Sequence, residues 1–170
     1  IAATVVTVSS EMAVVARRDR GIEAARDLAG KRVGVTLGTS GEYYLWAFLI
    51  RNKLRPDGLT LVDVAPAQIV QALSKGTVDA VATWQPLKFN AQSALGTQGV
   101  SFAEDNVYTT SHVIVGRSDF LKAHPEIMQK LLRATLQAER FQRAQPSEAL
   151  ALAAQRLAVD AQALKPSWQE

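Results

Sequence analysis

The spacing of hydrophobic positions changes several times along the chain, and the changes predict an alternation of strands and helices. Residues 12–17, Met-Ala-Val-Val-Ala-Arg, form a short apolar run rich in β-branched side chains, which is typical of a buried strand. Similar runs, or an alternation of apolar and polar residues, predict further strands at 32–37, 59–64, 78–83, 100–103 and 112–116. No stretch of about 18 apolar residues occurs, so the sequence predicts no membrane-spanning helix.

Helical spacing of apolar residues is found between these strands and over the last third of the chain. Tyr44, Leu45 and Phe48 recur at this spacing and predict a helix over 42–54. Shorter helices are expected at 22–28, 66–73 and 86–96, and two long ones at 125–143 and 147–164. Strands that alternate with helices over short connections predict an α/β fold with mostly parallel strands.

Composition narrows the class of protein. The chain has 170 residues, of which 48% are hydrophobic and 21% charged, so it is long enough to bury a core and too apolar for a disordered chain. The net charge is +3, and the basic residues are dispersed among acidic ones, so we expect no nucleic-acid partner. Cysteine is absent, which excludes disulfides, thiolate metal sites and a cysteine nucleophile.

The segment Gly38-Thr39-Ser40-Gly41 lies between a predicted strand and the helix that begins near Glu42. Glycines permit a tight turn, and the first amides of a helix have no acceptor within the helix. With the two hydroxyls, this loop can hold an anion such as a carboxylate, sulfonate, phosphate or nitrate. It is not a nucleotide-binding P-loop, because the lysine after the last glycine is missing. The alternative is that Thr39 or Ser40 only caps the helix.

Trp84-Gln85-Pro86 directly follows a predicted strand. Ligands of open α/β sheets collect at the carboxyl ends of the strands, where a tryptophan can form a pocket wall. The alternative is an ordinary core tryptophan followed by a proline at the first position of a helix.

Side-chain groups for catalysis are few. The only histidines are His112, which could face a cleft, and His124, which precedes a proline at a helix start and suits a surface or capping role. Asp79 precedes a strand and is interpreted as a turn residue rather than a base. No carboxylates stand at metal-ligand spacing from the histidines, so we expect no metal site, no cofactor and no enzyme.

The order of several motifs along the chain resembles the type 2 periplasmic solute-binding proteins. The nearest branch comprises the receptors of ABC transporters for nitrate, sulfonates, taurine and thiamine precursors. The resemblance begins near Ser10 and covers nearly the whole chain. The residues that carry it are 12–22, 27–44, 76–86 and 124–134.

This resemblance implies a fold of two α/β lobes with the ligand in the cleft between them. Residues 31–99 resemble the second lobe, while 1–30 and 100–170 resemble parts of lobe one, whose N-terminal part has no counterpart in this chain. Hinges are expected near Arg32 and within 102–111. The ligand-binding residues that we derive from the resemblance and the loop are Gly38, Thr39, Ser40, Gly41, Glu42, Trp84, Gln85, Pro86, Ser10 and Glu11.

The resemblance also implies a function. It indicates a periplasmic or extracytoplasmic solute-binding component of an ABC-type importer that captures a small anion and presents it to a membrane permease. Two alternatives are the ligand-sensing input domain of a signalling protein and, less well supported, an enzyme related to the thiamine-precursor branch. That enzyme chemistry needs a cysteine-rich motif and iron, and this chain has no cysteine.

Two finer expectations concern the ligand and the assembly. Gln85 stands where the resembling receptors commonly have an acid, so we expect a simple anion or neutral polar ligand rather than a zwitterion, unless Glu42 or Glu11 supplies the acid. A lobe that lacks its first strands exposes a sheet edge beside residues 12–17. We therefore expect a homodimer through that edge, with exchange of the helices 125–143 and 147–164 as one route.

Overall fold

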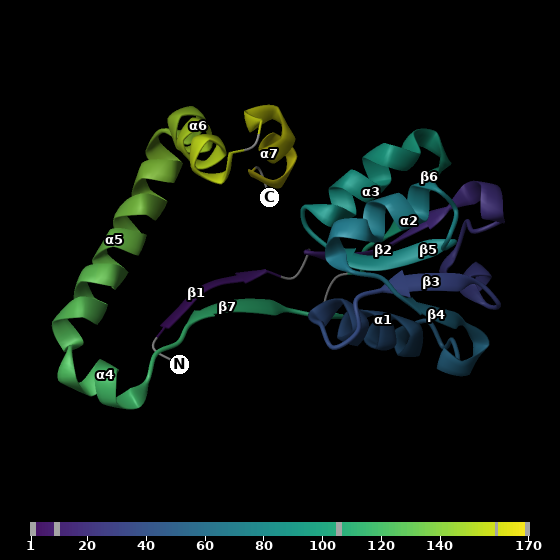
Figure 1. Ribbon diagram of the computed structural model, residues 1–170, viewed down its shortest axis with the longest axis horizontal. Helices are drawn as coiled ribbons and strands as arrows, with labels where there is room; N and C mark the ends of the chain where they lie inside the picture. The colour runs from purple at the N-terminus through teal and green to yellow at the C-terminus, as the bar shows by residue number, and fades with distance from the viewer. Residues whose placement is uncertain (1–2, 9–10, 105–106, 159, 169–170) are drawn as a thin grey trace. The chain divides into compact units, whose positions relative to one another are not determined.

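The computed structural model describes residues 3–8, 11–104, 107–158 and 160–168. The chain divides into two compact units: unit 1 comprises Ile1–Thr7 and Ser111–Glu170, and unit 2 comprises Val8–Thr110 (Figure 1). None of the helices in the described ranges is long and apolar enough to cross a membrane.

Unit 2 contains a five-stranded sheet with the order β4-β3-β5-β2-β6. The strands are β2 (Met12–Arg17), β3 (Arg32–Val35), β4 (Thr60–Asp63), β5 (Ala80–Trp84) and β6 (Gly99–Phe102). β3 pairs in parallel with both β4 and β5, whereas β2 is antiparallel to both β5 and β6. The predicted α/β class is confirmed, and β2 is the strand that departs from the expected parallel direction.

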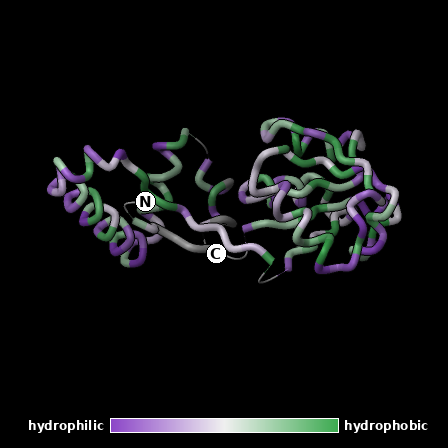
Figure 2. The backbone as a smooth tube through the Cα atoms, turned by 90° about the horizontal axis from the view of Figure 1, so that it is seen from below, coloured by the Kyte–Doolittle hydropathy of each residue, from purple (hydrophilic) through white to green (hydrophobic). Residues whose placement is uncertain are grey.

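Helices cover both faces of this sheet (Figure 1). α1 (Ser40–Arg51) packs on one face, where Tyr44, Leu45 and Phe48 join a core with alternate residues of β2, β3 and β5. α2 (Ile69–Ser74) and α3 (Leu87–Leu95) lie on the other face, over Val15 and Val81. Along the backbone tube of Figure 2, hydrophobic stretches alternate with hydrophilic ones. The predicted helix at 22–28 is instead a short 3₁₀ turn, Ala25–Leu28.

The border between the units differs from the expected lobe borders at 31 and 99. β2 lies between β5 and β6 and is buried from Met12 to Ala16, so residues 8–30 and 100–110 fold with unit 2. The chain passes from one unit to the other at Thr7–Val8 and Thr110–Ser111. A crossing therefore falls inside the expected hinge at 102–111, whereas Arg32 lies within β3 in the middle of unit 2.

Unit 1 is made of a two-stranded sheet, β1 (Ala3–Val8) with β7 (Thr110–Ile114), and of four helices. The helices are α4 (Ser118–Ala123), α5 (Pro125–Ala144), α6 (Pro146–Leu157) and α7 (Ala161–Trp168). The apolar spacing did not predict β1 and α4, and it predicted one helix over 147–164. That helix ends at Leu157 because Ala158 adopts the left-handed conformation with φ 54°.

Candidate functional site

The loop between β3 and α1 is held by the neighbouring strand β4. Thr36 Oγ1 donates a hydrogen bond of 2.7 Å to the carbonyl of Val64, and the amide of Leu37 donates to Asp63 Oδ1 at 3.1 Å. These bonds fix the turn that presents residues 38–41 at the carboxyl end of β3. Asp63 was not singled out from the sequence, since a strand-end acid carries no signal of the loop it will contact.

The hydroxyl of Thr39 is used inside the loop. Thr39 Oγ1 accepts the amide of Gly41 at 3.2 Å and donates to the carbonyl of Thr36 at 2.7 Å. Thr39 is thus the N-cap of α1, as the capping alternative predicts. Ser40 follows as the first helical residue, and within the described ranges its hydroxyl has no hydrogen-bond partner.

The carboxylate of Glu42 turns back onto the same loop. Glu42 Oε2 accepts the amide of Gly38 at 2.7 Å, and Oε1 accepts the indole N–H of Trp46 at 3.4 Å. The arrangement is a variant of the capping box, in which an acid three residues after the N-cap returns to the amides before it. Within the described ranges, the amides of Thr39 and Ser40 remain without an acceptor.

The two predicted segments meet at Gly41. A Cβ atom on Gly41 would lie 3.2 Å from Cζ3 of Trp84 and 3.3 Å from the carbonyl oxygen of Ala82. A side chain here would therefore force its neighbours to shift by a few tenths of an ångström, because α1 packs closely against the end of β5. Trp84 is only partly buried and adds to the core under α1, so it is a core residue that also borders the loop.

Gln85 and Pro86 form the start of α3. Pro86 is the N-cap residue, and Gln85 Oε1 accepts the amide of Phe89 at 3.3 Å. The amide of Gln85 donates to the carbonyl of Glu11 at 3.2 Å, which places Glu11 beside this segment.

The structure thus brings nine of the ten predicted residues to one edge of the sheet, and the tenth, Ser10, lies outside the described residues.

The charges at this edge are mixed. The loop offers the amides of Thr39 and Ser40 and the dipole of α1, which favour an anion. Glu42, by contrast, brings a carboxylate to the same loop. Glu42 is thus placed where it could supply the acid that Gln85 lacks.

Asp79 has a structural role at the opposite end of β5. Its Oδ2 accepts the backbone amide of Arg32 at 2.9 Å, and its Oδ1 accepts a guanidinium N–H of Arg32 at 2.8 Å. Hydrogen bonding to Arg32 lowers the pKa of Asp79 from its ordinary value, although burial opposes the shift. Both oxygens of the Asp79 carboxylate bind Arg32 and so join β3 to β5. This agrees with the interpretation of Asp79 as a structural residue rather than a base.

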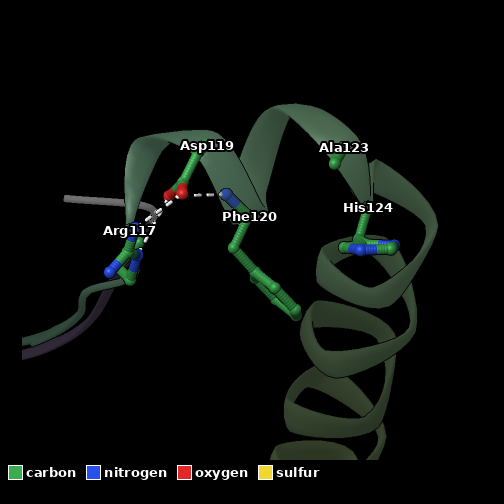
Figure 3. Close-up of a pocket in the computed structure, with 5 residues that line it drawn as sticks. All are labelled: Arg117, Asp119, Phe120, Ala123 and His124. Carbon is green, nitrogen blue, oxygen red and sulfur yellow. Dashed lines mark hydrogen bonds and ion pairs between the residues drawn. The ribbon is translucent and has the colours of Figure 1, made fainter.

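The histidines lie away from these segments in the sequence, His112 as an exposed residue of β7 and His124 at the start of α5. His124 is the N-cap residue of α5, 3.5 Å from Glu126, with its ring centroid 4.9 Å from that of Phe120. Figure 3 shows the residues that line a pocket beside it, where Asp119 accepts hydrogen bonds from Arg117 and from the amide of Phe120. No group of three metal-ligating side chains is found in the described part of the chain.

The family model described as "NMT1/THI5 like" matches residues 2–149. A binding protein of Brucella abortus (strain 2308) is 25% identical over 143 residues, which are 82% of this chain and 45% of that protein. The taurine-binding periplasmic protein of Escherichia coli (strain K12) is 28% identical over 123 residues, 69% of this chain and 37% of that protein. The chain thus spans less than half the length of these relatives.

Solved structures share the fold. The periplasmic aliphatic sulphonate binding protein SsuA of Escherichia coli superposes with a TM-score of 0.76 at 21% identity, over 98% of this chain and 57% of that one. The desulfurization enzyme DszB superposes with a TM-score of 0.61 at 19% identity, over 93% of this chain and 60% of that one. The predicted periplasmic-binding-protein fold is confirmed, and because the family model covers most of its length, the chain belongs to the NMT1/THI5-like family.

Proposed function

We propose that this chain captures a small organic anion, with a sulfonate as the best candidate, as the solute-binding component of an ABC-type importer. One observation carries the proposal. The loop 38–41 and the segment 84–86 meet at Gly41, and among the described residues nothing there accepts from the amides of Thr39 and Ser40 or bonds to the hydroxyl of Ser40. Amides at a helix N-terminus together with a hydroxyl suit a sulfonate or carboxylate group.

The relatives support the choice of ligand without deciding it. One is a taurine-binding protein, and taurine carries both a sulfonate and an ammonium group. Glu42 at the loop could pair with such an ammonium, which weakens the expectation of a simple anion drawn from Gln85. We therefore propose a sulfonate with or without an amine, and the comparison of taurine with ethanesulfonate separates the two.

The setting of the protein follows from the same proposal. Its partner would be a permease of an ABC transporter, and its location would be the periplasm or another extracytoplasmic space. The ligand would lie in the interlobe cleft that the family resemblance implies.

The alternative function is a ligand-sensing input domain. A neighbouring gene for a permease would count against this alternative, whereas a fused output domain would support it. Catalysis is not part of the proposal, although an enzyme, DszB, shares the fold. The free sheet edge expected beside residues 12–17 is not there, because β2 pairs with both β5 and β6. A homodimer through another surface stays a prediction, tested by light scattering at dilute concentration.

The test is isothermal titration calorimetry of the purified chain with ethanesulfonate, taurine, nitrate, acetate and a thiamine-type pyrimidine. We expect saturable heat with at least one sulfonate, and we expect Ser40→Ala to weaken it about tenfold through loss of a hydrogen bond to a charged group. Ser93→Ala, on the exposed side of α3, is the matched control and should bind as the wild type does. A folded protein that gives no heat with any of these compounds would refute the proposal.

A further inference from the structure

A cavity of about 340 Å³ lies in unit 1, where the end of α5 meets the start of α6 and the helix α7. It is far along the chain from the loop 38–41, and it belongs to a different unit. None of its lining residues is acidic. They are Gln142, Arg143, Pro146, Ser147, Leu150, Lys165 and Trp168.

Two cationic side chains line this cavity. Arg143 donates one hydrogen bond of 2.7 Å to Glu139, one turn earlier on α5, and the rest of its guanidinium fork remains for another acceptor. Lys165 comes from α7 and makes no ion pair with any residue that the structure describes. Because only one of the two cations is paired with an acid, the cavity keeps an excess of positive charge.

Uncharged donors add to these cations. The indole Nε1 of Trp168 is buried and has no hydrogen-bond partner within the described ranges. A buried donor without an acceptor is rare, because its lost hydration is not replaced. Trp168 lines the cavity, so this unpaired indole N–H belongs to a residue of the cavity wall.

The start of α6 supplies a third kind of donor. Its first helical hydrogen bond runs from the amide of Ala149 to the carbonyl of Gln145 at 3.0 Å, and no side chain caps the helix. The amides of Ser147 and Glu148 therefore precede the helical hydrogen bonds, and Ser147 also brings a hydroxyl to the cavity wall.

The geometry points to a second anion site in this protein, formed by Arg143, Lys165, Ser147 and Trp168, that takes a small oxyanion such as phosphate or sulfate. Every polar group named in the cavity can donate, two carry positive charge, and none is an acid. This site goes beyond the proposed importer function, and its test does not depend on anion binding at the loop 38–41.

The test follows the indole N–H signals of the three tryptophans by two-dimensional proton–nitrogen NMR while inorganic phosphate is added at constant ionic strength. Trp168→Phe identifies the Trp168 signal by its disappearance. We expect that signal to move and to saturate. The Trp46 and Trp84 signals report on the other anion site, since Trp46 contacts Glu42 and Trp84 borders Gly41.

Charge variants complete the test. Lys165→Gln should weaken the phosphate response of Trp168 about three- to fivefold, as expected for one partly exposed ionic contact. Lys130→Gln removes the same charge from an exposed position of α5 outside the cavity and should leave the response unchanged. Arg143→Gln serves as a second variant if Lys165→Gln disturbs α7. A Trp168 signal that does not move, or that responds equally in the Lys165 and Lys130 variants, would overturn the inference.

Discussion

Glu42 decides how strongly the loop 38–41 can hold an anion. Its carboxylate accepts the amide of Gly38 at 2.7 Å, so one of the loop amides already has a negatively charged partner from the chain itself. A ligand anion bound to the neighbouring amides of Thr39 and Ser40 would meet this carboxylate at close range. We expect Glu42→Gln to strengthen the binding of a simple anion, because it removes the like charge and keeps an oxygen that can accept from Gly38.

The size of the effect follows from distance and exposure. Two like charges about 5 Å apart repel by about 3 kcal/mol at an effective dielectric constant near 20, and by about 1 kcal/mol in bulk water. Glu42 is only partly buried, so the lower part of this range applies, and affinity for ethanesulfonate should rise about five- to tenfold. The weaker helix cap should cost about 0.5 kcal/mol of stability, too little to unfold the protein.

Calorimetry with two ligands tests the reasoning. Ethanesulfonate should bind more tightly to Glu42→Gln, whereas taurine should gain less or lose affinity, since its ammonium group would lose the carboxylate partner. Glu23→Gln removes an exposed charge outside the site and serves as the control. The argument is wrong if ethanesulfonate binds the folded Glu42→Gln protein no better than it binds the Glu23→Gln protein.

Three further predictions concern packing, charge and stability. Gly41→Ala should destabilise the fold by about 1–2 kcal/mol, because its Cβ would press on the Trp84 ring and a carbonyl; Gly58→Ala, which meets no atom within 4 Å, is the control in thermal unfolding. Gln85→Glu should weaken the binding of ethanesulfonate relative to taurine in the same calorimetry; an unchanged ratio would contradict it. Asp79→Asn should cost about 2 kcal/mol in urea unfolding at neutral pH by weakening the contacts with Arg32. Since the folded-state pKa of Asp79 is lowered, its contribution is present above the unfolded pKa and is lost as the pH falls through the folded value, so the difference from wild type should shrink in acid.

Local signals in the sequence predicted the parts of the site that depend on neighbouring residues. The strand Met12–Arg17 was predicted with its exact bounds, because an apolar run rich in β-branched residues has few other stable conformations. Thr39 was predicted as a possible cap, and the loop before α1 was placed at the end of a strand. Residues 38–41 and Trp84 lie at the ends of two parallel strands. Because the carboxyl ends of parallel strands share one edge of a sheet, the two segments meet there.

Features that depend on distant residues or on the choice of one rotamer were not predicted. The carboxylate of Glu42 could point to solvent or back to Gly38, and the spacing of residues is the same in both cases. No glycine marks the end of the helix at Ala158, so the apolar spacing predicted a helix that continues through this residue. The borders of the compact units differ from the lobe borders expected at 31 and 99, because an apolar strand shows that it is buried and does not show in which sheet.

The direction of β2 explains how Glu11 reaches the site. In a parallel neighbour of β5, the residue before the strand would lie at the end where Asp79 and Arg32 interact. β2 runs antiparallel, and the pairing of Met12 with Trp84 brings the beginning of β2 to the carboxyl end of β5. The carbonyl of Glu11 therefore accepts the amide of Gln85, although the two residues are far apart in the sequence. One reversed strand thus adds a third segment to an edge that parallel strands alone would form from 38–41 and 84–86.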